Sequence, residues 1–96
     1  MQYRQGDVLV ESKPIPKEAT LRHDPVLARG EATGHCHTAK GDMEIYERDG
    51  VLYLRVGKAG GTVAHQEHSE IVLPRGDYEV TIQREYAPEA IRNVSD

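Results

Sequence analysis

The sequence predicts a single all-β domain with a modest core, and three observations support this. Short apolar, β-branched runs recur along the chain, with Gly, Pro and Asp between them. The length of 96 residues suits one domain with a modest core. The aromatic residues are five tyrosines, so Val, Leu and Ile must supply most of that core. We expect residues 1–96 to form one antiparallel sandwich or small barrel of about seven or eight short strands.

Four strands are predicted within residues 1–56. Residues 8–11 follow a Gly-Asp pair and precede two closely spaced prolines, which cannot donate hydrogen bonds to a neighbouring strand. Residues 27–33 are a plausible strand that runs towards the first histidine pair. Residues 43–47 and 51–56 form the clearest hairpin, because Asp49-Gly50 between them can adopt the positive φ angles of a tight turn.

The next segment, residues 57–61, is glycine-rich, and we expect it to be a flexible turn. Strands are predicted at residues 62–65 and 71–73. The longest predicted strand covers residues 78–86, where apolar and polar residues alternate. Residues 88–94 have Pro and Glu at the start of a short helical pattern. The alternative fold is therefore a small α+β sheet with one C-terminal helix.

Charge and composition restrict the function. The net charge is −4 with acids and bases interspersed, whereas a nucleic-acid binder normally carries a basic stripe. The N-terminus has no apolar segment of signal-peptide length, and no apolar run is long enough to span a membrane. Cys36 is the single cysteine and cannot form an internal disulfide. We expect a cytoplasmic protein that binds neither nucleic acid nor membrane.

Four of the five histidines form two close pairs, His35/His37 and His65/His68. If residues 35–37 are extended, both imidazoles of the first pair point to the same side, about 7 Å apart at Cα. That separation allows both rings to reach one metal ion at about 2.1 Å from each nitrogen. Imidazole is the commonest protein ligand for transition metals. The sequence therefore predicts one metal site formed by both pairs.

The second pair has an offset of three residues, which does not suit a flat strand. Side chains three apart share one side in a helical turn, a bulge or a strand end that runs into a loop. The polar residues Gln66 and Glu67 allow such an irregularity before residue 71. The alternative is that both pairs are simply exposed surface histidines.

Carboxylates near the pairs are candidates for acid–base chemistry. Glu67 precedes His68, and Glu44 lies in the hairpin that follows the first pair. Either residue can complete a coordination shell, hold an imidazole N–H or act as a general base, and the alternative is a solvated strand edge. Cys36 is expected to be buried on the face opposite the histidines, with a role as a third ligand as the alternative. His23 is expected to lie outside the site.

The first histidine pair resembles a motif of the cupin superfamily, whose double-stranded β-helix barrels hold a metal with a strand-borne H-x-H, a later Glu and a distant His. The positions that carry the resemblance are Gly30, His35, His37, Glu44 and Gly50, together with Pro74-Arg75-Gly76. The sequence departs from the second cupin motif at Glu79, where that motif has its histidine. The resemblance implies a cupin-like barrel in which His65 or His68 supplies the missing ligand.

A second resemblance covers most of the second half of the chain. The patterns G-x-x-T-G-H-x-H, from Gly30 to His37, and H-x-E-H-x-x-I-x-L-P-x-G, from His65 to Gly76, are similar to a family of small uncharacterised bacterial proteins. The same resemblance extends through Q-R-E-Y to Pro88. It implies a bacterial cytoplasmic protein with a shared site, and it implies no activity.

These observations leave two main functional hypotheses open. In the first, three or four imidazoles hold Zn, Fe, Ni, Mn or Cu with an open coordination position, and the domain is a small metalloenzyme acting on a small molecule, with Glu67 or Glu44 as acid–base partner. In the second, the domain is a structural or interaction module with a closed zinc site or no metal, and its partner is another protein or a second copy of itself. A nucleophilic role for Cys36 is disfavoured, because His35 and His37 should point away from it.

Overall fold

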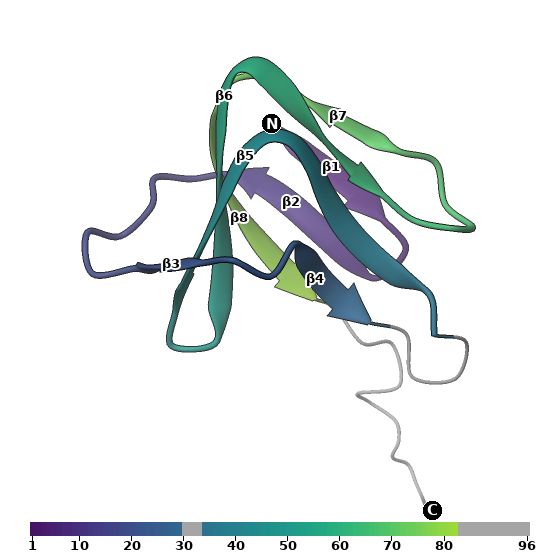
Figure 1. Cartoon of the computed structure of the whole chain (residues 1–96), viewed down its shortest axis with the longest axis horizontal. Coiled ribbons are helices and arrows are strands. Elements are labelled where there is room, and N and C mark those ends of the chain that lie inside the picture. The colour runs from purple at the N-terminus through teal and green to yellow at the C-terminus, as the bar shows by residue number, and fades with distance from the viewer. Residues whose placement is uncertain (30–33, 83–96) are drawn as a thin grey trace, which may run out of the picture.

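The computed structural model describes residues 1–29 and 34–82, and in this part of the chain all regular structure is β-strand. There are eight strands, namely β1 (Gln2–Gln5), β2 (Val8–Ser12), β3 (Thr20–Arg22), β4 (Val26–Arg29), β5 (Cys36–Arg48), β6 (Val51–Ala64), β7 (Ile71–Leu73) and β8 (Gly76–Ile82). Figure 1 shows their arrangement. The predicted all-β class is confirmed.

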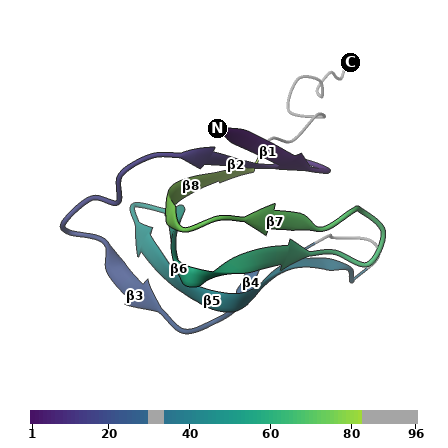
Figure 2. The same cartoon turned by 90° about the horizontal axis from the view of Figure 1, so that it is seen from above.

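The strands form one antiparallel sheet in the order β1-β2-β8-β6-β5-β3, with β4 also paired to β5 and β7 also paired to β6. The two ends of this order, β1 and β3, do not pair with each other in the described residues, so the sheet is not closed. Seen from above, β1, β2 and β8 lie on one side of the molecule and β3, β4 and β5 on the other (Figure 2). This bent sheet is compatible with a small sandwich.

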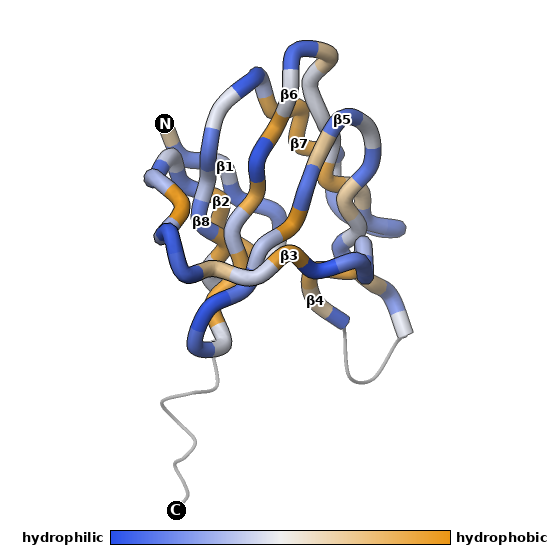
Figure 3. The backbone as a smooth tube through the Cα atoms, turned by 60° about the vertical axis from the view of Figure 1, so that its left-hand side comes forward, coloured by the Kyte–Doolittle hydropathy of each residue, from blue (hydrophilic) through white to orange (hydrophobic). Residues whose placement is uncertain are grey.

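The core lies between these two sides and is mainly aliphatic. Its buried members are Val8, Val10, Leu27, Ile45, Leu52, Leu54, Val56, Val63, Ile71, Leu73, Tyr78 and Val80. On β8, Tyr78 and Val80 point inward while Glu79 and Thr81 point outward, as the alternation in the sequence predicts. Figure 3 shows hydrophobic and hydrophilic positions following one another along β6. A sheet with one buried face explains this pattern.

The predicted hairpin between β5 and β6 is confirmed. Asp49 and Gly50 have φ angles of 51° and 78°, and Arg48 pairs directly with Val51 across the turn. Two central residues with positive φ are typical of a type I′ turn, whose twist matches that of the two strands.

The turn predicted at residues 57–61 is wrong, because β6 continues through this segment. The ladder is nevertheless irregular there: Met43 pairs with Val56, but Gly41 pairs with Gly61. The Asp42 carboxylate fills this interruption, accepting the backbone N–H of Ala59 at 3.3 Å and lying where a Cβ on Gly57 would be. The glycines therefore allow a local bulge and not a reversal of the chain.

Other predicted boundaries are confirmed in part. The predicted strands at residues 8–11 and 71–73 correspond to β2 and β7, and the start of the one at 27–33 corresponds to β4. Residues 30–33, the end of the long last strand and the C-terminal helix predicted at 88–94 lie outside the described residues. Within the described part of the chain, no helix is long and apolar enough to cross a membrane.

Candidate metal centre

The two histidine pairs meet in space although about thirty residues separate them. The ring centroids of His37 and His65 are 4.4 Å apart, and those of His65 and His68 are 4.6 Å apart. His35 lies edge-on to His65 at 5.7 Å, and the rings of His37 and His68 are parallel at 6.3 Å. All four predicted ligand residues therefore belong to one cluster, which we call the histidine cluster.

Two segments carry the histidine cluster, and a third segment lies against it. His35 directly precedes β5 and His37 is its second residue, and His65 and His68 lie in the loop of residues 65–70 between β6 and β7. The turn at residues 6–7 between β1 and β2 is the third segment. Figures 1 and 2 both show these segments at the same end of the molecule. The irregularity that the three-residue offset predicts before residue 71 is confirmed as this loop.

His37 is the buried member of the cluster, with 5% of its surface exposed. Its Nδ1 lies 2.7 Å from Oε1 of Gln5, a side chain that is itself buried. The Gln5 amide nitrogen donates to the carbonyl oxygens of Val63 and Ser69 at 2.9 Å and 2.8 Å. Gln5 therefore joins β1, β5, β6 and the loop at one point.

Burial and neighbouring imidazoles lower the pKa of His37. Loss of hydration is the main cause, and the adjacent His65 adds to it, whereas Asp7 acts in the opposite direction. The pKa of His65 is lowered in the same way, by burial and then by His68 and His35. The neutral form of imidazole, which is the form that binds metals, is therefore favoured at His37 and His65.

The ring of His65 also organises its own loop. Its Nδ1 accepts the backbone N–H groups of Glu67 and His68 at 3.0 Å and 3.3 Å. In the neutral ring Nδ1 then holds the lone pair and Nε2 carries the proton. In this conformation, His65 shapes the turn and does not present a lone pair outward.

Two further contacts define the rim of the cluster. Nδ1 of His35 is 3.6 Å from a carboxylate oxygen of Glu67, whose side chain is 63% exposed. The His68 ring lies over Gly6, where a Cβ would be 2.7 Å from Nε2. One predicted acid–base candidate, Glu67, is thus beside a predicted ligand.

Sequence reasoning missed Gln5 and Asp7, which belong to the same site. Oδ1 of Asp7 lies 3.7 Å from Nε2 of His37. The available signal was Gly6-Asp7, a dipeptide that favours a two-residue turn and brings residue 7 to the end of a hairpin. Nothing local in the sequence indicates that this hairpin end meets His37, because 30 positions separate residues 7 and 37.

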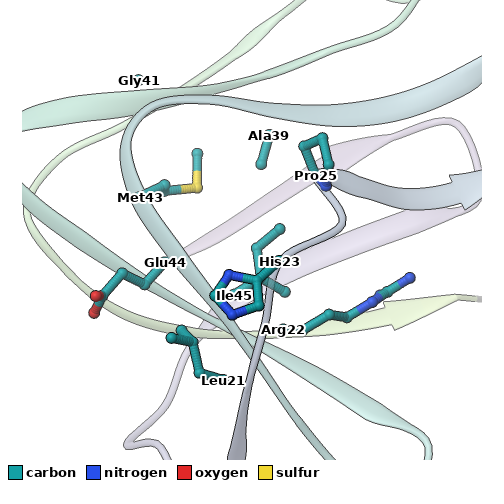
Figure 4. Close-up of a pocket in the computed structure, with 9 residues that line it drawn as sticks. All are labelled: Leu21, Arg22, His23, Pro25, Ala39, Gly41, Met43, Glu44 and Ile45. Carbon is teal, nitrogen blue, oxygen red and sulfur yellow. The ribbon is translucent and has the colours of Figure 1, made fainter.

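Glu44, the other predicted acid–base residue, lies in a different region. It accepts the hydroxyl of Tyr46 at 3.0 Å and lines a pocket with His23 and Met43. Figure 4 shows the Glu44 carboxylate directed away from the His23 ring. His23 lies outside the histidine cluster, as expected.

Cys36 was expected to be buried, but it is only half-buried. Its Sγ is 3.9 Å from the carbonyl oxygen of Gly34.

The cluster is not arranged around a single point. Among the residues that the structure describes, no three His, Cys, Asp or Glu side chains are placed so that they could hold a metal ion as they stand. The predicted ligands lie close together, but metal binding would require some of the rings to rotate.

A family described as "Domain of unknown function (DUF8820)" matches residues 4–83 of the chain. The chain belongs to this family. The DUF8820 match spans both histidine pairs and the Gly6-Asp7 turn, and it confirms the expectation of an uncharacterised family. The search of curated proteins and the search of solved structures give no match.

Proposed function

We propose that this domain binds a divalent transition metal at the histidine cluster. The observation that carries the proposal is the convergence of His35 and His37 with His65 and His68 around one buried imidazole. Four imidazoles within reach of one another offer several nitrogen ligands to a single ion. The family description adds no activity to this argument.

Rotation of the outer rings is energetically feasible. His65 and His35 are partly exposed and His68 is exposed, so their rings can turn without disturbing the core. Releasing the two hydrogen bonds at Nδ1 of His65 costs about 1–3 kcal/mol. That cost weakens the apparent affinity for a metal by about 5-fold to 150-fold. Rearrangement therefore lowers the affinity without preventing binding, and Gln5 holds His37 in place.

An open coordination position would make the domain a small metalloenzyme. A bound metal would act as a Lewis acid or lower the pKa of a coordinated water. Glu67 is beside His35 and exposed to solvent, so it can exchange protons with a small-molecule substrate. Glu44 has no contact with the cluster that would support the same role. Zn, Fe, Ni, Mn and Cu all accept imidazole ligands.

The resemblance to the cupin superfamily forms part of this proposal. Its support is the H-x-H pair at the start of β5 and the P-x-G segment that leads into β8. Glu79, at the position of the motif's histidine, forms an ion pair with Lys13, so the remaining ligands have to come from the loop of residues 65–70.

A closed structural zinc site is the second candidate. Its support is the burial of His37 together with the position of the cluster, which joins the start of β5 to the loop of residues 65–70. A metal there would act as a crosslink in a chain with a small core. The partner would then be another protein or a second copy of the chain.

Metal analysis of protein purified without a histidine tag tests the proposal. We expect one Zn²⁺ or Co²⁺ per chain by calorimetric titration, and loss of binding in both His37→Ala and His68→Ala. His23→Ala is the matched control, because His23 lies outside the cluster, and it should bind normally. Absence of binding to the unaltered protein would overturn the proposal, and loss in only one variant would show that the pairs do not share a site.

Chelation separates the two candidates. If EDTA unfolds the domain, as circular dichroism would show, the metal is structural. If the fold persists and added azide changes the visible spectrum of the Co²⁺ form, a coordination position is open to small molecules.

A further inference from the structure

The turn between β1 and β2 carries a carboxylate into the histidine cluster. Gln5 pairs with Val8, so Gly6 and Asp7 are the two central residues of the turn. Only Gly6 has a positive φ, 60°, which is the pattern of a type II′ turn with glycine first. The glycine also leaves room for the ring of His68 directly above it. This local geometry places Asp7 next to the cluster.

Gln5 determines which nitrogen of His37 carries the proton. Both hydrogens of the Gln5 amide are used by the carbonyl oxygens of Val63 and Ser69. The group facing Nδ1 of His37 is therefore the amide oxygen, which can only accept a hydrogen bond. In the neutral ring Nδ1 carries the hydrogen, and Nε2 carries the lone pair.

Nε2, the nitrogen that carries the lone pair, lies near the carboxylate of Asp7. The separation of Nε2 and Oδ1 is 3.7 Å, which is too long for a direct hydrogen bond. Both atoms have a lone pair to donate when the imidazole is neutral, so a cation between them would be attracted by both. A metal bonded to each atom at about 2.1 Å would give this separation with an angle of about 120° at the metal, which is normal for a four-coordinate or five-coordinate site.

We infer that Asp7 is a ligand of the metal, opposite Nε2 of His37, and that Gln5 is the positioning residue that directs this nitrogen toward it. The inference rests on the proposed metal-binding function and deepens it. A carboxylate beside imidazoles reduces the net charge of a divalent site to +1. It also favours Zn²⁺, Fe²⁺ and Mn²⁺ over the softer Cu⁺, which prefers sulfur ligands.

His65 has a different role in this arrangement. Its Nδ1 holds the turn of residues 67 and 68, so it can leave coordination to His35, His37 and His68. Three imidazoles and one carboxylate are enough to fill a tetrahedral shell, and two imidazoles with the carboxylate leave a position for water. A site formed by Asp7 and two or three imidazoles therefore does not require all four rings to rotate.

Titration with Co²⁺ alone tests the role of Asp7. Asp7→Asn keeps the shape of the side chain and removes its charge, and we expect Co²⁺ affinity to fall at least tenfold, with weaker visible absorption bands. Asp24→Asn is the matched control, because Asp24 is an exposed carboxylate that pairs with Arg22 away from the cluster. Circular dichroism checks folding, and Asp7→Ser serves as a second variant if Asp7→Asn is unstable.

The outcomes distinguish this inference from the proposed function. If the unaltered protein binds Co²⁺ and Asp7→Asn binds equally well, Asp7 is not a ligand, while the metal-binding proposal stands. If the unaltered protein binds neither Co²⁺ nor Zn²⁺, both fail together.

Long-range ¹H–¹⁵N spectra of the metal-free protein test the role of Gln5 without any substitution. At about pH 7.5, where neutral imidazole predominates, we expect the proton of His37 on Nδ1. On addition of Zn²⁺, the ¹⁵N signal of Nε2 should shift more than that of Nδ1. A proton on Nε2, or on both nitrogens as in an ion pair with Asp7, would overturn the positioning role.

Discussion

The histidine cluster and the pocket around His23 contain similar residues but differ in their surroundings. Both regions combine imidazole with a nearby glutamate, Glu67 in the first and Glu44 in the second. In the cluster, three separate segments meet and Gln5 holds a buried ring. At the pocket, His23 and Glu44 are both exposed, and Glu44 is bonded to Tyr46. The comparison shows that long-range contacts to a buried side chain, more than residue type, distinguish a candidate site.

The largest expected effect comes from Gln5→Leu. The substitution leaves the carbonyl oxygens of Val63 and Ser69 and Nδ1 of His37 without their buried partner, which should lower the free energy of unfolding by about 3 kcal/mol. Urea denaturation measures the change. The matched control is Gln2→Leu, because Gln2 bonds only to Glu11 at the surface, and it should change stability by less than about 0.5 kcal/mol. Equal effects would mean that Gln5 does not hold the cluster together.

Two glycines provide the next comparison. Gly6 and Gly50 both have positive φ angles, 60° and 78°, so alanine at either position should cost about 1 kcal/mol of stability through backbone strain. Only at Gly6 does the added Cβ meet the ring of His68, since the space at Gly50 is open. Gly6→Ala alone should therefore shift the NMR signals of the histidine cluster and weaken Co²⁺ binding. Unchanged signals would contradict the close contact at Gly6.

Acid should destabilise the metal-free protein through the cluster. The folded state lowers the pKa of His37 below its usual 6.5, so protons bind preferentially to the unfolded chain. Stability is then fully present above pH 6.5 and is lost as the pH falls through the pKa of the folded state. Urea denaturation in EDTA over this range should show the loss. His37→Asn should flatten the curve and His23→Asn should not; a flat curve for the unaltered protein would refute the expectation.

The smallest effects are expected at the two glutamates. Glu44→Gln and Glu67→Gln both alter exposed polar contacts, and each should change stability by less than about 0.5 kcal/mol. A carboxylate near a divalent cation contributes a similar energy, so Glu67→Gln should weaken Co²⁺ binding about twofold, whereas Glu44→Gln should leave it unchanged. Calorimetric titration of the two variants in parallel makes this comparison. Equal changes in affinity would remove the distinction between the two regions.

Local patterns in the sequence predict much of the fold. Alternation at residues 78–82 predicts β8 and the burial of Tyr78 and Val80, although Ile82 is exposed. Asp49-Gly50 predicts the hairpin, because both predictions depend on neighbouring residues. β1 was not predicted, since Gln2–Gln5 is polar and only its last residue is buried. Its pairing with β2 supplies the stability that its composition does not. The glycine-rich segment at 57–61 was interpreted as a turn because the contribution of Asp42 comes from another strand.

The site could be predicted only where its members are close in sequence. The H-x-H pair and the three-residue offset of His65 and His68 indicate which residues share a side, and the structure brings both pairs together. Gln5 and Asp7 could not be found in this way, because their contacts with His37 arise from the packing of the β1–β2 hairpin against β5. Whether the cluster binds metal stays a prediction.

The bulge opposite Asp42 determines which side of β6 each residue occupies. Before it, the even-numbered Leu52, Leu54 and Val56 are buried; after it, the odd-numbered Gly61 and Val63 are buried. Met43 of β5 pairs with Val56 of β6, and Gly41 pairs with Gly61. One residue of β5 therefore lies opposite four residues of β6, so β6 has three extra residues. Because three is an odd number, the buried positions of β6 change from even-numbered to odd-numbered residues. If the register after the bulge continued, residue 65 would lie opposite residue 37. Deleting one residue between Val56 and Gly61 would turn His65 away from His37, whereas deleting two residues would keep both histidines on the same side of the sheet.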